Sequence, residues 1–215
     1  MEGDMESDDE MSQYEKMCSA NVKPGMFVSG WDDPADLVQE DKNPHESLDR
    51  EILWAANEGK IDVIREILHL DPDSVNSVDD DGYTPLHRAC YNNFVDIAEL
   101  LLKFKANPNA QTELKWTPLH SACKWSNAEC AALLLQHGAD VNAKSDGLQT
   151  PLHIAATVSN CRNVASILLL DRNIDPDALN NSEETAADIA KRTGLTYPVF
   201  EMGHSAYRVE TGLID

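Results

Sequence analysis

The tetrapeptide Thr-Pro-Leu-His occurs three times in this chain, at 84–87, 117–120 and 150–153, each copy 33 residues after the last. An alanine keeps nearly the same step over a longer stretch, at positions 55, 89, 122, 155 and 190. A period near 33 is typical of repeat architectures, in which one unit is too small to bury its own apolar face. Such a chain must therefore stack its units against one another to build a continuous core.

A leucine-rich run follows each copy of the tetrapeptide at a matching place. These runs read LLLKFKANPNA at 100–110, LLLQHGADVNA at 133–143 and LLLDRNIDPDA at 168–178. Together with three copies of TPLHxA in phase, they make the chain over roughly 48–205 resemble the ankyrin-repeat family. The resemblance implies an all-α ankyrin-repeat solenoid of stacked helix-turn-helix units with hairpin-like loops.

About five repeats are expected, and the two terminal ones depart from the signature. REIL at 50–53 and TAAD at 185–188 replace TPLH, as terminal caps of a repeat array do. The fourth repeat is longer than the second and third, and NCRN at 160–163 is expected to loosen the turn between its helices. We place the ankyrin-repeat domain at 47–205, with repeats at about 48–80, 81–113, 114–146, 147–181 and 182–205.

Each position of the tetrapeptide has a local structural role. Threonine is a good N-cap, and proline fits the first helical position because its missing N–H has no partner there. The histidines are expected to bond backbone or threonine groups within their own repeat and across to the next. Imidazoles related by stacking point in parallel, so they do not converge on one metal ion at the bond length of about 2.0–2.1 Å that zinc requires. We therefore predict no metal site.

The composition excludes several functional classes. With 38 acidic and 17 basic residues, the formal net charge of −21 argues against direct nucleic-acid binding and against anionic membranes. No apolar run of about 18 residues predicts a membrane span, and the first residues lack the features of a signal peptide. The five cysteines form no CxxC pair and are expected to be reduced and buried. We expect a monomer in the nucleus, the cytoplasm or both.

The sequence also lacks the motifs of common enzyme classes. It contains no GxSxG, no P-loop, no HExxH and no paired Cys/His arrangement. We therefore predict no catalytic residues, no cofactor and no enzymatic activity.

The two ends of the chain differ from the repeats. Residues 1–46 are rich in Asp and Glu and poor in apolar residues, which predicts a mostly disordered acidic tail. Ser7 precedes three acidic residues and is a candidate site for phosphorylation by an acidophilic kinase. Residues 206–215 are treated as a C-terminal tail.

The resemblance implies a concave groove, lined by variable positions of the inner helices and by loop tips. Carried over to this sequence, the partner-binding set is Trp54, Tyr83, Arg88, Tyr91, Lys115, Trp116, Ser121, Lys124, Trp125, Ile154 and Thr157. Trp, Tyr and Arg are frequent interface hot spots. For Trp54 and Trp116 the alternative stays open that they close gaps between a loop and its neighbour. Arg88 and Lys124 on an acidic protein favour an acidic or aromatic-bearing partner peptide.

Three loop asparagines recur in register with the repeats. Asn76, Asn109 and Asn142 each follow a leucine by eight residues. Such asparagines normally bond the backbone of their turn. The resemblance implies a second possibility, hydroxylation by an asparaginyl hydroxylase.

These observations favour a non-enzymatic adaptor or scaffold that binds a partner protein through the concave groove. The alternative is a nuclear regulator that promotes transcription through protein partners, without contacting DNA. Methionines and aromatic residues dispersed in the acidic segment 1–46 support that alternative, because acidic activation segments share this composition.

Overall fold

The structure, a computed structural model, describes residues 44–193 and 198–200. The described residues contain helices and no strand, and the all-α ankyrin solenoid expected from the repeat is confirmed. The elements in chain order are η3 (Pro44–Glu46), α2 (Leu48–Asn57), α3 (Ile61–Leu70), η4 (Pro72–Asn76), α4 (Pro85–Tyr91), α5 (Val95–Lys103), α6 (Pro118–Lys124), α7 (Ala128–Gln136), α8 (Pro151–Ala156), α9 (Arg162–Leu169) and α10 (Ala186–Thr193). The last three residues of the predicted tail 1–46 form η3. The rest of the tail, Ser7 and residues 206–215 lie outside the described residues.

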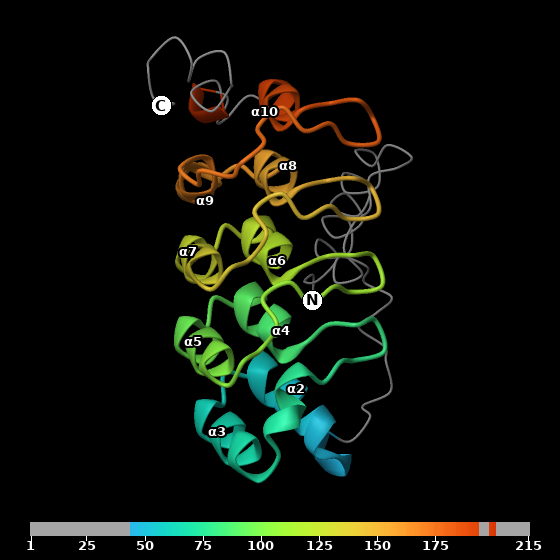
Figure 1. Cartoon of the computed structure of the whole chain (residues 1–215), viewed down its shortest axis with the longest axis vertical. Helices are drawn as coiled ribbons and strands as arrows, with labels where there is room; N and C mark the ends of the chain where they lie inside the picture. The colour runs from blue at the N-terminus through green and yellow to red at the C-terminus, as the bar shows by residue number, and fades with distance from the viewer. Residues whose placement is uncertain (1–43, 194–197, 201–215) are drawn as a thin grey trace, which may run out of the picture. The chain divides into compact units, whose positions relative to one another are not determined.

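The helices form two parallel layers along the stack. The inner helices α2, α4, α6, α8 and α10 each pack against the next inner helix, and the outer helices α3, α5, α7 and α9 do the same (Figure 1). The loops that lead into α4, α6, α8 and α10 project from the side of the inner helices (Figure 1). The loops of successive repeats therefore lie on the same side of the stack, next to the inner helices.

The stack is held together by a core to which the three central repeats contribute the same positions. The leucine of each tetrapeptide, at 86, 119 and 152, is fully or almost fully buried. Burial of such a side chain stabilises the fold by about 1.5–3 kcal/mol. Ala89, Ala122 and Ala155 are fully buried on neighbouring inner helices, where their small side chains let the helices approach closely.

The turn between the two helices of a repeat has a fixed form that the fourth repeat abandons. In the first three repeats it spans three residues and contains one left-handed residue: Gly59 (φ 70°), Asn93 (φ 59°) or Ser126 (φ 58°). In the fourth repeat the turn runs over 157–161 and contains no residue of positive φ. The longer turn lies where NCRN was expected to loosen the structure.

Four of the five cysteines fall within the described residues. Cys90, Cys123, Cys130 and Cys161 are reduced and buried, as predicted. Burial raises the pKa of the Cys90 and Cys123 thiols, which keeps them protonated. Of the helices that the structure describes, none has the length and apolar character to cross a membrane.

Candidate partner-binding surface

Each tetrapeptide closes a capping box at the start of its inner helix. The backbone N–H of Thr84 donates to His87 Nδ1 at 3.1 Å, and the backbone N–H of His87 donates to Thr84 Oγ1 at 3.4 Å. The other two copies form the same box. Two otherwise unpartnered amides are thereby satisfied at each helix start.

The same histidines link each repeat to the next. Nε2 lies 3.1 Å from the carbonyl oxygen of Trp116 for His87, and 3.0 Å from that of Gln149 for His120. Because Nδ1 accepts the threonine amide, the ring proton belongs on Nε2, which donates it to the carbonyl. Burial lowers the pKa of His87 to about 3 and that of His120 to about 4, so both rings are neutral at pH 7. The predicted structural role of these histidines is confirmed.

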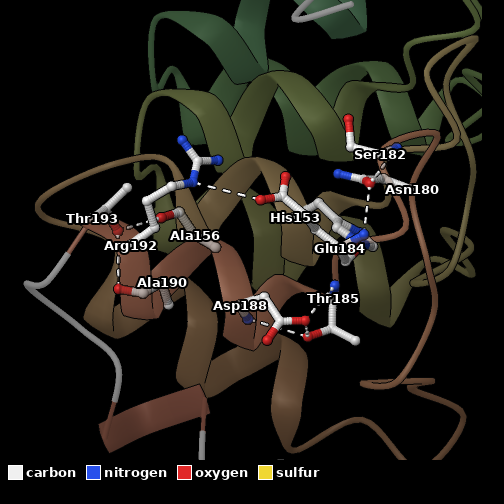
Figure 2. A network of polar contacts seen from close by, with 10 residues as sticks. All are labelled: His153, Ala156, Asn180, Ser182, Glu184, Thr185, Asp188, Ala190, Arg192 and Thr193. Atoms are coloured by element: carbon white, nitrogen blue, oxygen red, sulfur yellow. Dashed lines mark hydrogen bonds and ion pairs between the residues drawn. The ribbon is translucent and has the colours of Figure 1, made fainter. Parts of the chain in front are cut away.

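The last inner helix, α10, has the capping contact at its start, with a different residue in place of the histidine (Figure 2). His153 Nε2 reaches the carbonyl oxygen of Glu184 at 3.1 Å, which ties the fourth repeat to the fifth. In the fifth, Asp188 stands where the histidine would be and accepts from the Thr185 amide at 3.0 Å and from its hydroxyl at 2.7 Å. A carboxylate can only accept here, so Asp188 caps the helix and offers no donor to a further repeat.

A second recurring position, which the sequence analysis missed, closes the hairpin-like loops. In each loop a short polar side chain accepts the backbone N–H four residues later, at 2.8–3.3 Å. These residues are Asp79, Thr112, Ser145 and Asn180. The signal was available, because each of them stands five residues before the capping threonine of its repeat.

Adjacent loops are also bonded to one another near their tips. The backbone N–H of Glu113 donates to the carbonyl oxygen of Asp81 at 2.9 Å, and that of Asp146 donates to the carbonyl oxygen of Leu114 at 3.1 Å. Asn181 and Gly147 repeat the contact at 3.1 Å in the next pair of loops. These bonds keep the loop tips in register on the side of the inner helices.

The structure removes four residues from the predicted partner-binding set. The side chains of Tyr83, Trp116, Ser121 and Ile154 are buried, with 3–6% of their surface exposed. The ring of Trp116 lies 5.7 Å from the ring of His120. Because these four side chains are buried, a partner cannot reach them in this conformation. For Trp116 the alternative of a gap-closing residue is the one that the structure supports.

The other predicted side chains keep solvent exposure: six lie on the inner helices or directly after them, and one lies in a loop. They are Trp54, Arg88, Tyr91, Lys115, Lys124, Trp125 and Thr157. We use the name presenting surface for these seven residues together with the tips of the loops that lead into α4, α6, α8 and α10. Trp54 packs edge-on against His45, with the ring centroids 5.2 Å apart. Thr157 donates its hydroxyl proton to the carbonyl oxygen of Ile154 in its own helix at 2.7 Å.

An aromatic pair stands out on the presenting surface. Trp125 follows α6 directly, and its ring meets that of Tyr91, at the end of α4, with centroids 4.7 Å apart. The Trp125 side chain remains 42% exposed. Tryptophan combines a large apolar area with few rotatable bonds, which makes it an effective anchor in interfaces. The two aromatic residues span two repeats.

The electrostatic character of this surface differs from the sequence-based expectation. Arg88 forms an ion pair with Asp79 at 2.5 Å and stacks over the ring of Tyr83, at 5.5 Å from its centroid. Lys115 forms an ion pair with Asp146 of the next loop at 2.8 Å. Two of the predicted basic contacts are thus matched by carboxylates of the same surface. Of the two residues that favoured an acidic partner, Arg88 is therefore matched by Asp79, and Lys124 keeps solvent exposure.

The three loop asparagines link successive repeats. Asn109 Oδ1 accepts the backbone N–H of Asp140 at 2.7 Å, and its amide donates to the carbonyl oxygen of Gly138 at 3.0 Å. Asn76 and Asn142 accept backbone amides of the next repeat in the same way, each at 2.9 Å. A structural role is evident for all three, while their hydroxylation stays a prediction.

The buried histidines of the described repeats serve the structure. Across 44–193 and 198–200, no three or more His, Cys, Asp or Glu side chains are grouped so that they could hold a metal ion. The buried histidines are committed to capping boxes and inter-repeat bonds, which leaves them no proton-transfer role at the surface. What varies between repeats is the set of side chains at the helix ends and loop tips.

A stack of helix pairs with recurring capping boxes and variable exposed side chains is the architecture of repeat proteins that act as interaction modules. The family profile described as "Ankyrin repeats (3 copies)" matches residues 52–145 and 105–180. The chain belongs to the ankyrin-repeat family, whose members are generally non-enzymatic modules for protein–protein interaction.

Particular relatives share most of the chain. It is 69% identical over 214 residues to Ankyrin repeat domain-containing protein 49 of Drosophila melanogaster, covering 99% of this chain and 100% of the relative. It is 50% identical over 163 residues to the human protein of the same name, covering 76% of this chain and 68% of the relative. The shared name describes the repeat and specifies no activity.

Proposed function

We propose that this protein is an adaptor that captures a partner protein on the presenting surface, in the concave groove expected of the family. The observation that carries the proposal is the exposed Trp125 ring, which is paired with Tyr91 at the ends of adjacent inner helices. The other tryptophan of the same repeat, Trp116, is buried in the core, whereas the Trp125 ring is accessible to a partner. An exposed aromatic of this size on a rigid scaffold is typical of a recognition surface.

The proposal is tested by comparing partner capture with fold stability. Proximity labelling in cells would compare the wild type with the double variant Trp125→Ala/Lys124→Ala and with Leu170→Ala. Leu170 is 82% exposed and directly follows outer helix α9, so its truncation removes exposed apolar area on another part of the molecule. We expect the double variant to lose its labelled partners, the control to retain them, and all three proteins to melt at similar temperatures. Retained labelling in the double variant would contradict the assignment.

A nuclear regulatory role is a second candidate, and it rests on the composition of residues 1–46. Dispersed methionine and aromatic residues among many carboxylates are compatible with an activation segment that contacts other proteins. In that role the protein would act in the nucleus through partners, and as an adaptor it would act in the nucleus or the cytoplasm. Fusion of residues 1–46 to an unrelated DNA-binding domain tests this role in a reporter-gene assay. Absence of reporter activation would contradict it.

A further inference from the structure

The tips of the loops that lead into the inner helices are acidic. Asp81, Glu113, Asp146 and Glu183 are exposed near the tips of four successive loops. The inter-loop bond between the Glu113 amide and the Asp81 carbonyl oxygen holds two of these acidic residues side by side. Because inter-loop bonds hold the loops in register, these acidic residues are distributed along the loop side of the presenting surface.

The basic residues of this surface do not reverse its character. The guanidinium of Arg88 is largely covered, with 18% of its side chain exposed, and Asp79 neutralises its charge. Lys115 is matched by Asp146 from the neighbouring loop. Arg88 and Lys115 are therefore each paired with a carboxylate of the same row of loops. Lys124 is the third basic residue of the surface. The carboxylates of these loops outnumber the three cations; they are Asp79, Asp81, Glu113, Asp146 and Glu183. The edge therefore has a negative potential, which attracts cations and repels acidic segments.

From this charge distribution we infer that the presenting surface selects a basic segment of a partner protein. The segment would place lysine or arginine side chains along the acidic tips and one apolar side chain against Trp125. The inference rests on the proposed adaptor function and specifies the chemistry of the partner. It replaces the acidic partner that Arg88 and Lys124 favoured in the sequence.

The apolar contact is needed because surface ion pairs alone are weak. An exposed pair contributes about 0–1 kcal/mol and is screened by salt. The Trp125 ring supplies area that a side chain can cover, and it stands against Tyr91, which fixes its orientation. A basic segment with a well-placed apolar residue therefore satisfies both parts of the surface.

The test uses the full chain and fluorescent peptides in an anisotropy titration. One probe alternates lysine and serine around a central leucine, a second replaces lysine by glutamate, and a third replaces leucine by alanine. We expect the lysine–leucine peptide to bind most tightly and to weaken as salt is raised. Tighter binding of the glutamate peptide would overturn the inference.

Matched charge reversals separate the loop tips from the general acidity of the chain. The variant Glu113→Lys/Glu183→Lys changes two exposed tip residues, and Glu66→Lys/Glu129→Lys makes the same charge change on outer helices α3 and α7. Both proteins keep the acidic segment 1–46, so any attraction to that segment is common to them. The tip variant should bind the lysine–leucine peptide about three- to tenfold more weakly, with the control near wild type. Equal losses in the two variants would overturn the inference.

The two proposals can fail separately. If Trp125→Ala/Lys124→Ala abolishes partner capture in cells while the tip reversal leaves peptide binding unchanged, the adaptor function stands and the basic partner does not. If Trp125→Ala leaves the preference for the leucine peptide over the alanine peptide intact, the proposed contact between the apolar side chain and Trp125 is wrong.

Discussion

His87 Nε2 lies 3.1 Å from the carbonyl oxygen of Trp116, a residue 29 positions later in the next repeat. Through this contact one imidazole joins the helix start of its own repeat to the loop of its neighbour. The Trp116 ring is buried against His120, which makes the corresponding contact one repeat further on. Capping and stacking therefore depend on the same side chains, so a change at one histidine affects two repeats.

Truncation of a capping histidine should be costly. His120→Ala removes the bond to the Thr117 amide at 3.1 Å and the bond to the Gln149 carbonyl oxygen, and it leaves a cavity. We expect the free energy of unfolding to fall by about 2–4 kcal/mol in urea denaturation. His137→Ala, at an exposed imidazole, serves as the control and should change it by about 0.5 kcal/mol or less. Equal costs for the two variants would show that the box contributes nothing.

Stability should fall as the solution is acidified below neutrality. The pKa of His87 is lowered to about 3 and that of His120 to about 4 in the fold, whereas an unfolded histidine titrates near 6.5. Between these values the unfolded chain binds protons that the folded chain does not. The contribution is complete above about pH 6.5 and is lost as pH falls towards the folded values, by about 1–2 kcal/mol per histidine between pH 7 and pH 5. Urea denaturation midpoints across this pH range measure the loss of stability. The midpoint should depend less steeply on pH in His120→Gln than in the wild type.

Two glycines with the same backbone conformation should respond differently to alanine. Gly82 (φ 84°) and Gly138 (φ 83°) are both left-handed. A Cβ on Gly82 would lie 3.1 Å from the Cα of Thr112, whereas one on Gly138 would meet no atom within 4 Å. We expect Gly138→Ala to cost about 1 kcal/mol and Gly82→Ala about 2–3 kcal/mol in chemical denaturation. Equal costs for the two variants would show that the loop at Gly82 can shift away from Thr112 without loss of stability.

The two tryptophans of the third repeat should separate stability from binding. Trp116→Ala removes a ring that is 4% exposed and should lower the free energy of unfolding by about 3–5 kcal/mol. Trp125→Ala removes a ring that is 42% exposed and should cost about 1 kcal/mol or less. Thermal melts of the two variants measure the difference. A large loss for Trp125→Ala would mean that its ring supports the fold.

The local and periodic features of the protein were readable in the sequence. The capping box joins residues three positions apart, and the buried leucine follows two residues after the threonine, so both depend on short-range geometry. The period near 33 predicted the stacking because one helix pair cannot bury its apolar face alone. The loop-closing residues Asp79 and Thr112 obey the same register and were also readable, although they were overlooked.

Exposure and charge at the presenting surface were decided only by the tertiary structure. Trp116 and Trp125 belong to the same repeat, yet the first ring is buried in the core and the second is left exposed at a helix end. Likewise, the partner of Lys115 is Asp146 of the following loop, which no pattern of neighbouring residues indicates. The sequence determined which units form and that they stack, because those choices depend on contacts within a few residues. Which side chains remain available was settled by contacts between repeats, which exist only once the units lie against one another.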